Sequence, residues 1–240
     1  MNEQQSQNDF KSGAKKGIPI ALGYLPIGFT FGLIATSSGI ADFLVILISL
    51  TNFSATGQFA SVNLLSMGAS VYEIAMTTFI INSRYALMSL SLAQRIHPSV
   101  SRKIRSLLAI GITDEVFTVA AVQKEKTLNT SFLFGLELVS LSGWVLGTTM
   151  GVFLSGYFPL DLRNAMGIAL YAMFIAILVP ATKSSRPVLI ICAISIAITS
   201  IITWIPIFSF ISAGFKIIIA TIIAATIGAI YFPKEVNEYE

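Results

Sequence analysis

Three charged residues lie within stretches of the sequence that are otherwise apolar. Arg84 is near the middle of residues 71–93, and Asp114 and Glu115 are near the middle of residues 105–123. A charge at the centre of an apolar layer costs at least about 2.5–3.5 kcal/mol, so it is expected to be paired or hydrated. The simplest arrangement pairs Arg84 with Asp114 or with Glu115. The other carboxylate is then free to change protonation, as proton-coupled transport requires, whereas an ion pair that only fixes helix packing is the alternative.

Neutral hydrogen-bonding side chains accompany these charges. Ser54, Thr56 and Gln58 interrupt an apolar segment, and Asn82 lies close to Arg84 in the sequence. Any one of them could form a hydrogen bond between two helices inside a membrane. Together with an interrupted helix, they predict the lining of a polar cavity.

The first apolar segment, residues 17–38, contains two prolines. Pro19 and Pro26 lack a backbone donor and clash with the carbonyl one turn earlier, and Gly23 lies between them. This pattern predicts that the helix kinks or unwinds near Leu22–Leu25. The alternative is that Pro19 sits in the first turn and Pro26 only bends the helix.

An unwound helix would expose free backbone amides that can bind the carboxylate of a substrate. We therefore expect a carboxylate near Gly23–Pro26 and an apolar side chain near Ser54–Phe59, with Phe29 and Phe59 as walls. The expected substrate-binding residues are Gly23, Tyr24, Pro26, Ser54, Gly57, Gln58, Phe59 and Asn82.

Enzyme chemistry is not expected from this sequence. The histidine, His97, lies beside Pro98 in a basic loop and is expected at the surface. The zinc motif His-Glu-x-x-His, the phosphate-binding loop and the nucleophile elbow are all missing. The one cysteine, Cys192, excludes a disulfide framework and a cysteine metal cluster. No catalytic residue, metal or cofactor is predicted, and 240 residues leave no room for an ATPase domain.

The composition predicts an all-α integral membrane protein. Hydrophobic residues make up 55% of the chain and charged residues 11%, whereas soluble domains carry about 25% charged residues. The net charge of +3 comes from basic residues in short loops. This distribution is typical of topology signals facing a lipid bilayer and does not predict nucleic-acid binding.

The chain divides into eight apolar segments between two polar tails. We expect a cytoplasmic tail at 1–16, one transmembrane domain at 17–232 and a second tail at 233–240. The first segment is too long for a signal-peptide core and is expected to be a retained span. The segments are 17–38, 43–66, 71–93, 105–123, 131–155, 164–182, 187–206 and 209–232.

Basic residues argue against eight simple crossings. If every segment crossed from a cytoplasmic N-terminus, the most basic loop, Arg95–Arg105, would lie outside, against the positive-inside rule. That loop is cytoplasmic if an element within 43–93 and the segment 105–123 enter and return. The prediction is about six transmembrane crossings plus two re-entrant or broken helical elements. Eight ordinary tilted helices that break the charge rule are the alternative.

Two further patterns concern helix packing and repeats. Gly28 and Gly32 are four residues apart, and the same spacing recurs in Gly143–Gly151, so these helices are expected to pack closely or to seat a partner's helix. A weak similarity between 82–88 and 162–166 is consistent with an internal repeat, which is common in transporters.

Four motifs in order resemble the AzlC family of branched-chain amino acid exporters. They are Gly23–Phe29, Gly57–Ala60, Asn82–Met88 and Thr113–Phe117, and the resemblance covers roughly residues 13–123. One departure is Ser54–Thr56, where alanine and glycine are more usual in the family, and this puts the size of the substrate's side chain in doubt.

The resemblance implies export of leucine, isoleucine, valine or their analogues across the cytoplasmic membrane, driven by an ion gradient. It also implies a small hydrophobic partner subunit of the AzlD type. The residues themselves favour a carrier. A pore-forming channel and an accessory or scaffolding membrane protein are the alternatives.

Overall fold

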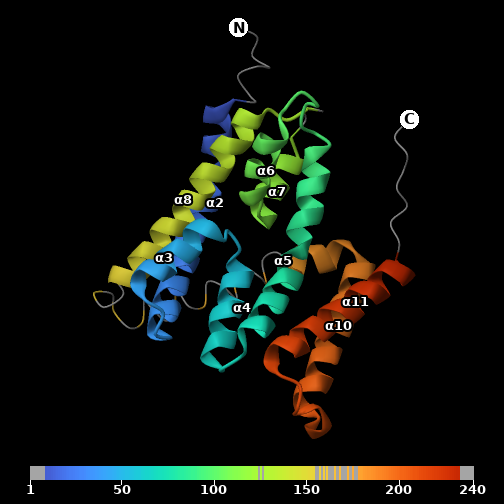
Figure 1. Ribbon diagram of the computed structural model, residues 1–240. Coiled ribbons are helices and arrows are strands. Elements are labelled where there is room, and N and C mark those ends of the chain that lie inside the picture. Colours follow the sequence, from blue (N-terminus) through green and yellow to red (C-terminus); the bar gives the residue numbers. More distant parts are fainter. Residues whose placement is uncertain are drawn as a thin grey trace. The chain divides into compact units, whose positions relative to one another are not determined.

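The computed structural model is built from α-helices, which confirms the predicted fold class. It describes residues 9–123, 125, 127–154, 157, 159, 161, 165, 168, 172, 175 and 178–232. The predicted repeat at 162–166 lies, except for Ala165, outside the described residues, and so does most of segment 164–182. The helices are α2 (Phe10–Ser37), α3 (Asp42–Thr51), α4 (Ala55–Ser66), α5 (Val71–Ala93), α6 (Arg102–Ile110), α7 (Asp114–Ala121), α8 (Thr130–Leu154), α10 (Arg186–Trp204), the 3₁₀ turn η2 (Pro206–Phe208) and α11 (Ala213–Tyr231) (Figure 1).

Long apolar helices support a membrane protein. In the described part of the chain, α2, α8, α10 and α11 are long and apolar enough to cross a bilayer. Only 6% of the apolar window of α10 is buried, so its hydrophobic side chains are available to lipid. The number of crossings and the cytoplasmic N-terminus stay predictions.

Two compact units make up the chain. The first comprises residues 1–62 and 78–170, and the second comprises 63–77 and 171–240. Helices α2, α3, α6, α7 and α8 belong to the first unit, while α10 and α11 belong to the second. Residues of α4 and α5 contribute to both units.

Helices α2 and α8 pack along a row of glycines in the first unit. A Cβ added at Gly28 would collide with the carbonyl oxygen of Trp144, and one added at Gly147 would collide with the carbonyl oxygen of Leu25. Gly32 lies in the same way against Thr148. Small residues let two backbones approach closely in lipid, where packing rather than the hydrophobic effect joins helices. The predicted packing role of these glycines is therefore confirmed.

The predicted break in the first span is wrong. Helix α2 is continuous from Phe10 to Ser37, with Pro19 and Pro26 inside it. Each proline removes one backbone hydrogen bond, but the long contact with α8 holds the helix together. The Oγ1 of Thr30 donates to the carbonyl of Pro26 at 3.0 Å, an additional hydrogen bond one turn after the second proline.

The other two predicted interruptions are confirmed. Segment 43–66 divides into α3 and α4 at Asn52–Ser54, and segment 105–123 divides at Gly111–Thr113, between α6 and α7. Each break is short, and a new helix N-terminus follows it. These two N-termini position the candidate site.

In the second unit, Glu73 fastens the start of α11. Its carboxylate accepts a hydrogen bond from the Ser212 hydroxyl at 2.5 Å and from the Gly214 amide at 2.8 Å. The side chain of Glu73 is buried within the protein. It caps a helix that begins 140 residues later in the chain, a partnership that sequence spacing does not reveal.

Candidate functional site

The first break holds the N-terminus of α4 against α5. Ser54 caps the helix, since its Oγ accepts from the Gly57 amide at 3.1 Å and donates to the Asn82 side-chain oxygen at 2.6 Å. A Cβ on Gly57 would lie 2.8 Å from the Ser54 hydroxyl and 3.1 Å from the Asn82 amide oxygen. A side chain at position 57 would therefore displace the Ser54 hydroxyl or the Asn82 amide from their contact.

A buried chain of hydrogen bonds braces the same break from the other side. Gln58 donates from its amide nitrogen to the carbonyl of Asn52, and its amide oxygen accepts from the Ser49 hydroxyl at 3.4 Å. Ser49 also bonds to Thr148 of α8, with 2.8 Å between their hydroxyl oxygens. Both ends of the Gln58 side chain are thus engaged within the protein. Sequence reasoning missed Ser49 and Thr148; polar side chains within apolar helices were the available signal.

The second break presents two neighbouring acids in different directions. Thr113 caps α7 by accepting from the Val116 amide at 3.3 Å. The hydroxyl of Tyr24, from α2, donates to the carboxylate of Glu115 and lies 2.9 Å from the Thr113 hydroxyl. Tyr24 therefore ties α2 to the first turn of α7.

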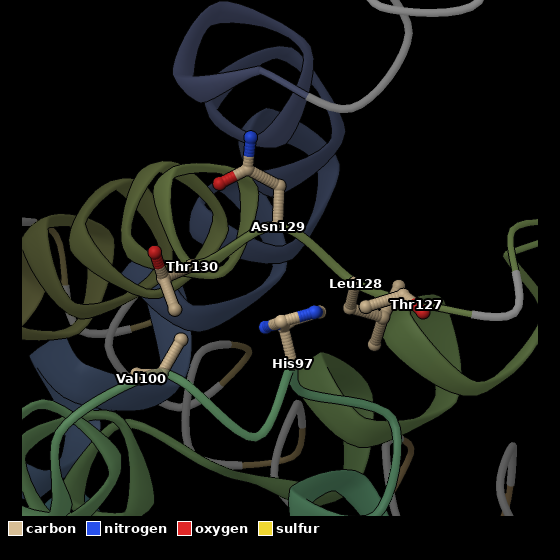
Figure 2. Close-up of a pocket in the computed structure, with 6 residues that line it drawn as sticks. All are labelled: His97, Val100, Thr127, Leu128, Asn129 and Thr130. Atoms are coloured by element: carbon tan, nitrogen blue, oxygen red, sulfur yellow. The ribbon is translucent and has the colours of Figure 1, made fainter.

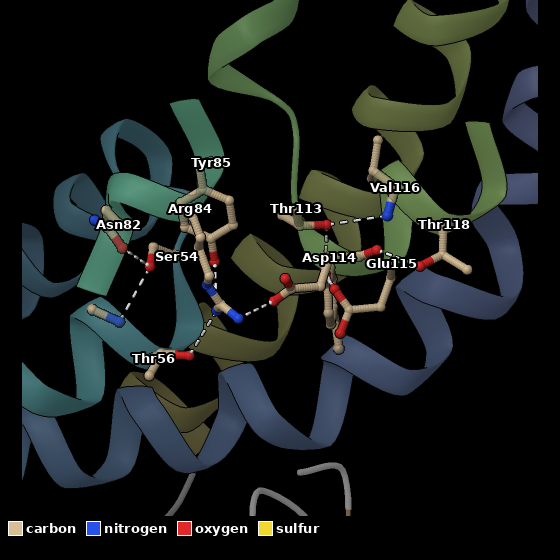
Figure 3. A network of polar contacts seen from close by, with 12 residues as sticks. Ser54, Thr56, Asn82, Arg84, Tyr85, Thr113, Asp114, Glu115, Val116 and Thr118 are labelled. Atoms are coloured by element: carbon tan, nitrogen blue, oxygen red, sulfur yellow. Dashed lines mark hydrogen bonds and ion pairs between the residues drawn. The ribbon is translucent and has the colours of Figure 1, made fainter. Parts of the chain in front are cut away.

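Arg84 bridges the two helix N-termini. Its Nη1 lies 2.8 Å from a carboxylate oxygen of Asp114, which confirms the predicted ion pair and identifies its acid. Its Nη2 lies 3.3 Å from the Thr56 hydroxyl in the first turn of α4, and also contacts the Tyr85 hydroxyl. Figure 3 shows the guanidinium reaching from α5 to Thr56 and to Asp114.

The pair is accessible to a ligand. The side chains of Arg84 and Asp114 keep 42% and 31% of their exposure. The Nε atom of Arg84 is buried and has no hydrogen-bond partner in the described part of the chain. Accessibility therefore comes from the outer part of the pair and not from this donor.

Aromatic rings lie next to these polar groups. The ring of Tyr24 meets that of Phe53, in the first break, at 5.6 Å and that of Trp144 at 5.8 Å, both edge to face. Phe31 continues the cluster by stacking on Trp144 at 6.1 Å and meeting Phe59 at 5.7 Å. The rings of Tyr24, Phe31, Phe53 and Trp144 are buried, so this cluster is an apolar core beside the polar groups.

The predicted site residues are partly brought together. Tyr24 joins Glu115, Ser54 joins Gly57 and Asn82, and Arg84 joins Asp114, all in the first unit. Gly23 does not join them, because it is exposed and a Cβ there would have no atom within 4 Å. Pro26 is held in the continuous helix, and Phe29 is completely buried. Gln58 and Phe59 take part in packing around the first break.

The arginines of the basic loop have a structural role that sequence reasoning missed. Arg95 donates to four carbonyls at and after the end of α7, at Ala120, Ala121, Gln123 and Glu125. Arg105 donates to carbonyls at and after the end of α5, including Ala93 and His97. Cations at helix C-termini satisfy free carbonyls and the helix dipole. Lys124 and Lys126, also expected to set topology, lie outside the described residues.

A hollow of about 270 Å³ opens beside this loop, but it shows no catalytic arrangement. His97 lines it and is exposed, as predicted, with its Nδ1 at 2.7 Å from the Ser99 hydroxyl (Figure 2). No group of three metal-ligating side chains occurs among the residues that the structure describes. The lining residues are His97, Val100, Thr127, Leu128, Asn129 and Thr130.

Comparison with known proteins agrees with the resemblance seen in the motifs. The sequence model of the AzlC protein family matches residues 19–158. The inner membrane protein YgaZ of Escherichia coli is 30% identical over 77% of this chain and 78% of its own. An uncharacterized membrane protein of Archaeoglobus fulgidus is 34% identical over 72% and 76%. A Bacillus subtilis protein named branched-chain amino acid transport protein AzlC is 23% identical over 71% and 66%. No solved structure matches the chain.

Proposed function

Because the chain belongs to the AzlC family of membrane proteins, we propose that it is the transport subunit of an exporter for branched-chain amino acids. It works as a secondary transporter in the cytoplasmic membrane, uses an ion gradient, and acts with a small AzlD-type partner. The name of the Bacillus subtilis relative supports the substrate class. The polar site in the first unit supports a carrier with a defined binding position.

The observation that carries the proposal is the Arg84–Asp114 pair at two helix N-termini. An amino acid is a zwitterion, with a carboxylate and an ammonium group on one carbon. Arg84 and the backbone amides of the first two residues of α4 would take the carboxylate, because the next two amides of that turn already bond to Ser54. Asp114 would take the ammonium group. The ion pair seen in the structure is then the arrangement that the substrate opens.

The surroundings of the pair favour an aliphatic side chain. Phe53 lies in the break before α4 and contacts Tyr24, which in turn is bonded to Glu115 beside Asp114. A substrate held by its charged end would therefore place its side chain against these rings. This position replaces the predicted one near Gly23, because the free amides lie at α4 and not within α2.

The test is radiolabelled leucine counterflow in proteoliposomes that contain the purified chain, with and without its companion subunit. Arg84→Gln and Asp114→Asn should each lower counterflow about tenfold to a hundredfold, since a hydrogen bond to a charged group contributes roughly 1.5–3 kcal/mol. Arg102→Gln, at an exposed arginine of α6, is the matched control and should leave counterflow unchanged.

Three results would contradict the proposal. Saturable counterflow that persists in Arg84→Gln would remove the binding position. Leucine release that is neither saturable nor ion-dependent would indicate a channel, and no transport in any combination of subunits would indicate an accessory protein. The yield of folded protein shows whether a variant loses counterflow through weaker binding or through lower stability. Removing one charge strands the other, so the double variant Arg84→Gln/Asp114→Asn should recover yield that Arg84→Gln loses.

A further inference from the structure

Glu137 is a buried acid that the proposed binding site does not use. The relative solvent exposure of Glu137 is 6%, and its Oε1 has no hydrogen-bond partner among the described residues. It is the one ionisable side chain of α8, a helix that is long and apolar enough to cross a membrane. The structure buries it among helices. An acid placed in this way is costly when charged and points to a function.

The carboxyl group lies against the second helix break. A Cβ added at Gly111 would lie 2.6 Å from the carboxyl carbon of Glu137 and 2.8 Å from its Cγ, and would also collide with Oε2. Gly111 is the C-cap of α6 and begins the break that ends at Thr113. The next residue is Asp114, the acid paired with Arg84. A change at the Glu137 carboxyl therefore acts directly on the backbone that positions Asp114.

No other charge neutralises Glu137 in the described part of the chain. The helices packed on α8 include α2, α3, α6 and α7, and the ion pair found among the described residues is Arg84–Asp114. Glu115 bonds to Tyr24, Lys16 donates to Gln123 and lies over the ring of Phe132, and Arg105 donates to carbonyls. The ionisable groups on these four helices are Lys11, Lys15, Lys16, Tyr24, Asp42, Arg102, Lys103, Arg105, Asp114 and Glu115.

We propose that Glu137 is the proton-binding residue that couples amino acid export to a pH gradient; this inference rests on the proposed function. The carboxylate takes one proton from the outer solution and releases it to the cytoplasm as an amino acid leaves. As a neutral acid it packs against Gly111, whereas the carboxylate requires water or a donor. The α6–α7 break therefore has a different packing in each protonation state, and Asp114 moves with it. Asp114 and Glu115 already have partners, which leaves Glu137 for the proton.

Two assays on the same proteoliposomes test this role. Leucine counterflow at equal pH on both sides measures binding and movement of the carrier, and leucine accumulation against its gradient under an imposed pH difference measures coupling. Glu137→Gln is neutral and close to isosteric, so it should keep counterflow within threefold of the wild type and lose gradient-driven accumulation at least tenfold. Glu73→Gln is the matched control at a second buried acid, where the glutamine oxygen can still accept from Ser212 and Gly214. It should keep both activities within threefold.

The two proposals fail in different ways. No counterflow by the wild type would refute the proposed function. Counterflow by the wild type together with full gradient-driven accumulation by Glu137→Gln would refute the coupling role, and so would accumulation driven by sodium but not by protons. If Glu137→Gln does not fold, a hydrophobic carbodiimide, which modifies protonated carboxyls in apolar surroundings, gives a second test on the wild type. Glu137 should be modified faster at acidic than at alkaline pH, and no modification of Glu137 at either pH would overturn the inference.

Discussion

One added methyl group at Gly147 should separate α2 from α8. A Cβ there would lie 3.0 Å from the carbonyl carbon and 3.1 Å from the Cα of Leu25, and would collide with the carbonyl oxygen. These are backbone atoms of α2, so no rotamer change can relieve the contact. Inserting a methyl group into a well-packed interface typically costs about 1–3 kcal/mol. In a bilayer, close packing is itself a main source of helix association. Gly147→Ala should therefore lower the free energy of unfolding by that cost, less the roughly 0.8–1.0 kcal/mol that alanine gains over glycine inside a helix.

Gly23 offers a matched control in the partner helix. It is exposed, and a Cβ there has no atom within 4 Å. Alanine is favoured over glycine inside a helix by about 0.8–1.0 kcal/mol, so Gly23→Ala should be neutral or stabilising. Gly147 also lies inside a helix and gains the same propensity, so the two variants should differ by about 1–3 kcal/mol, which is the cost of the close contact alone.

Unfolding of the purified chain in mixed micelles of sodium dodecyl sulfate and a mild detergent measures this difference, with helix content followed by circular dichroism. Gly147→Ala should unfold at a lower denaturing fraction than the wild type, and Gly23→Ala at an equal or higher one. Equal midpoints for the two variants would refute the close contact. Loss of stability in Gly23→Ala would mean that the backbone at this position is not helical, as the proline pattern originally indicated.

Two further predictions concern the loop between α5 and α6. Arg95→Ala removes the hydrogen bonds to the end of α7 and should lower the free energy of unfolding by about 1–2 kcal/mol, since its partners are part-exposed carbonyls. The control variant Arg102→Ala, at an exposed arginine, should lower it by less than about 0.5 kcal/mol. Equal losses in the two variants would contradict the capping role of Arg95. A cysteine at exposed Ser99 should react with a membrane-impermeant thiol reagent only after the cells are permeabilised, because the basic loop is expected in the cytoplasm; labelling in intact cells would contradict the predicted topology.

Sequence analysis located correctly the features that involve a polar or charged group within an apolar segment, where leaving the group unpaired costs free energy. Polar residues within an apolar segment predicted the break at Asn52–Ser54, since a helix there is easily interrupted and polar side chains can satisfy the exposed backbone. The acids within residues 105–123 predicted the second break and a partner for Arg84. In each case the reason was a group that cannot remain unpaired in an apolar layer.

The choice between Asp114 and Glu115 was beyond the sequence. Adjacent residues on a helix point about 100° apart, given 3.6 residues per turn, so one acid can reach Arg84 while the other faces α2. Which acid does so depends on the rotation of α7, and Tyr24 contributes to setting it by bonding to Glu115. This hydrogen bond joins residues 91 positions apart, a distance at which spacing carries no information.

The prolines of α2 show how tertiary packing overrides a local signal. Each proline removes a single hydrogen bond from the helix, whereas the row of glycines places α2 against α8 over most of its length, from Gly13 near Phe132 to Gly32 near Thr148. The glycine spacing and the prolines were both visible in the sequence. The sequence did not show which of the two signals would dominate, because that depends on the length of the interface between α2 and α8.

Sequence analysis placed the substrate carboxylate near Gly23 because a carboxylate needs hydrogen-bond donors. The proposed site at Arg84, in the same unit, also provides such donors. An amino acid carboxylate in a membrane needs donors that do not leave an unpaired charge when the substrate is absent. An interrupted α2 would have provided backbone amides alone. The observed arrangement joins the N-terminus of α4 to Arg84, and Asp114 pairs with Arg84. The proposed site is thus neutral as a whole, and a zwitterion would replace each half of the pair with a group of the same charge. A carrier that returns without its amino acid needs such a site, because the return step then exposes no uncompensated charge from the site to the apolar layer.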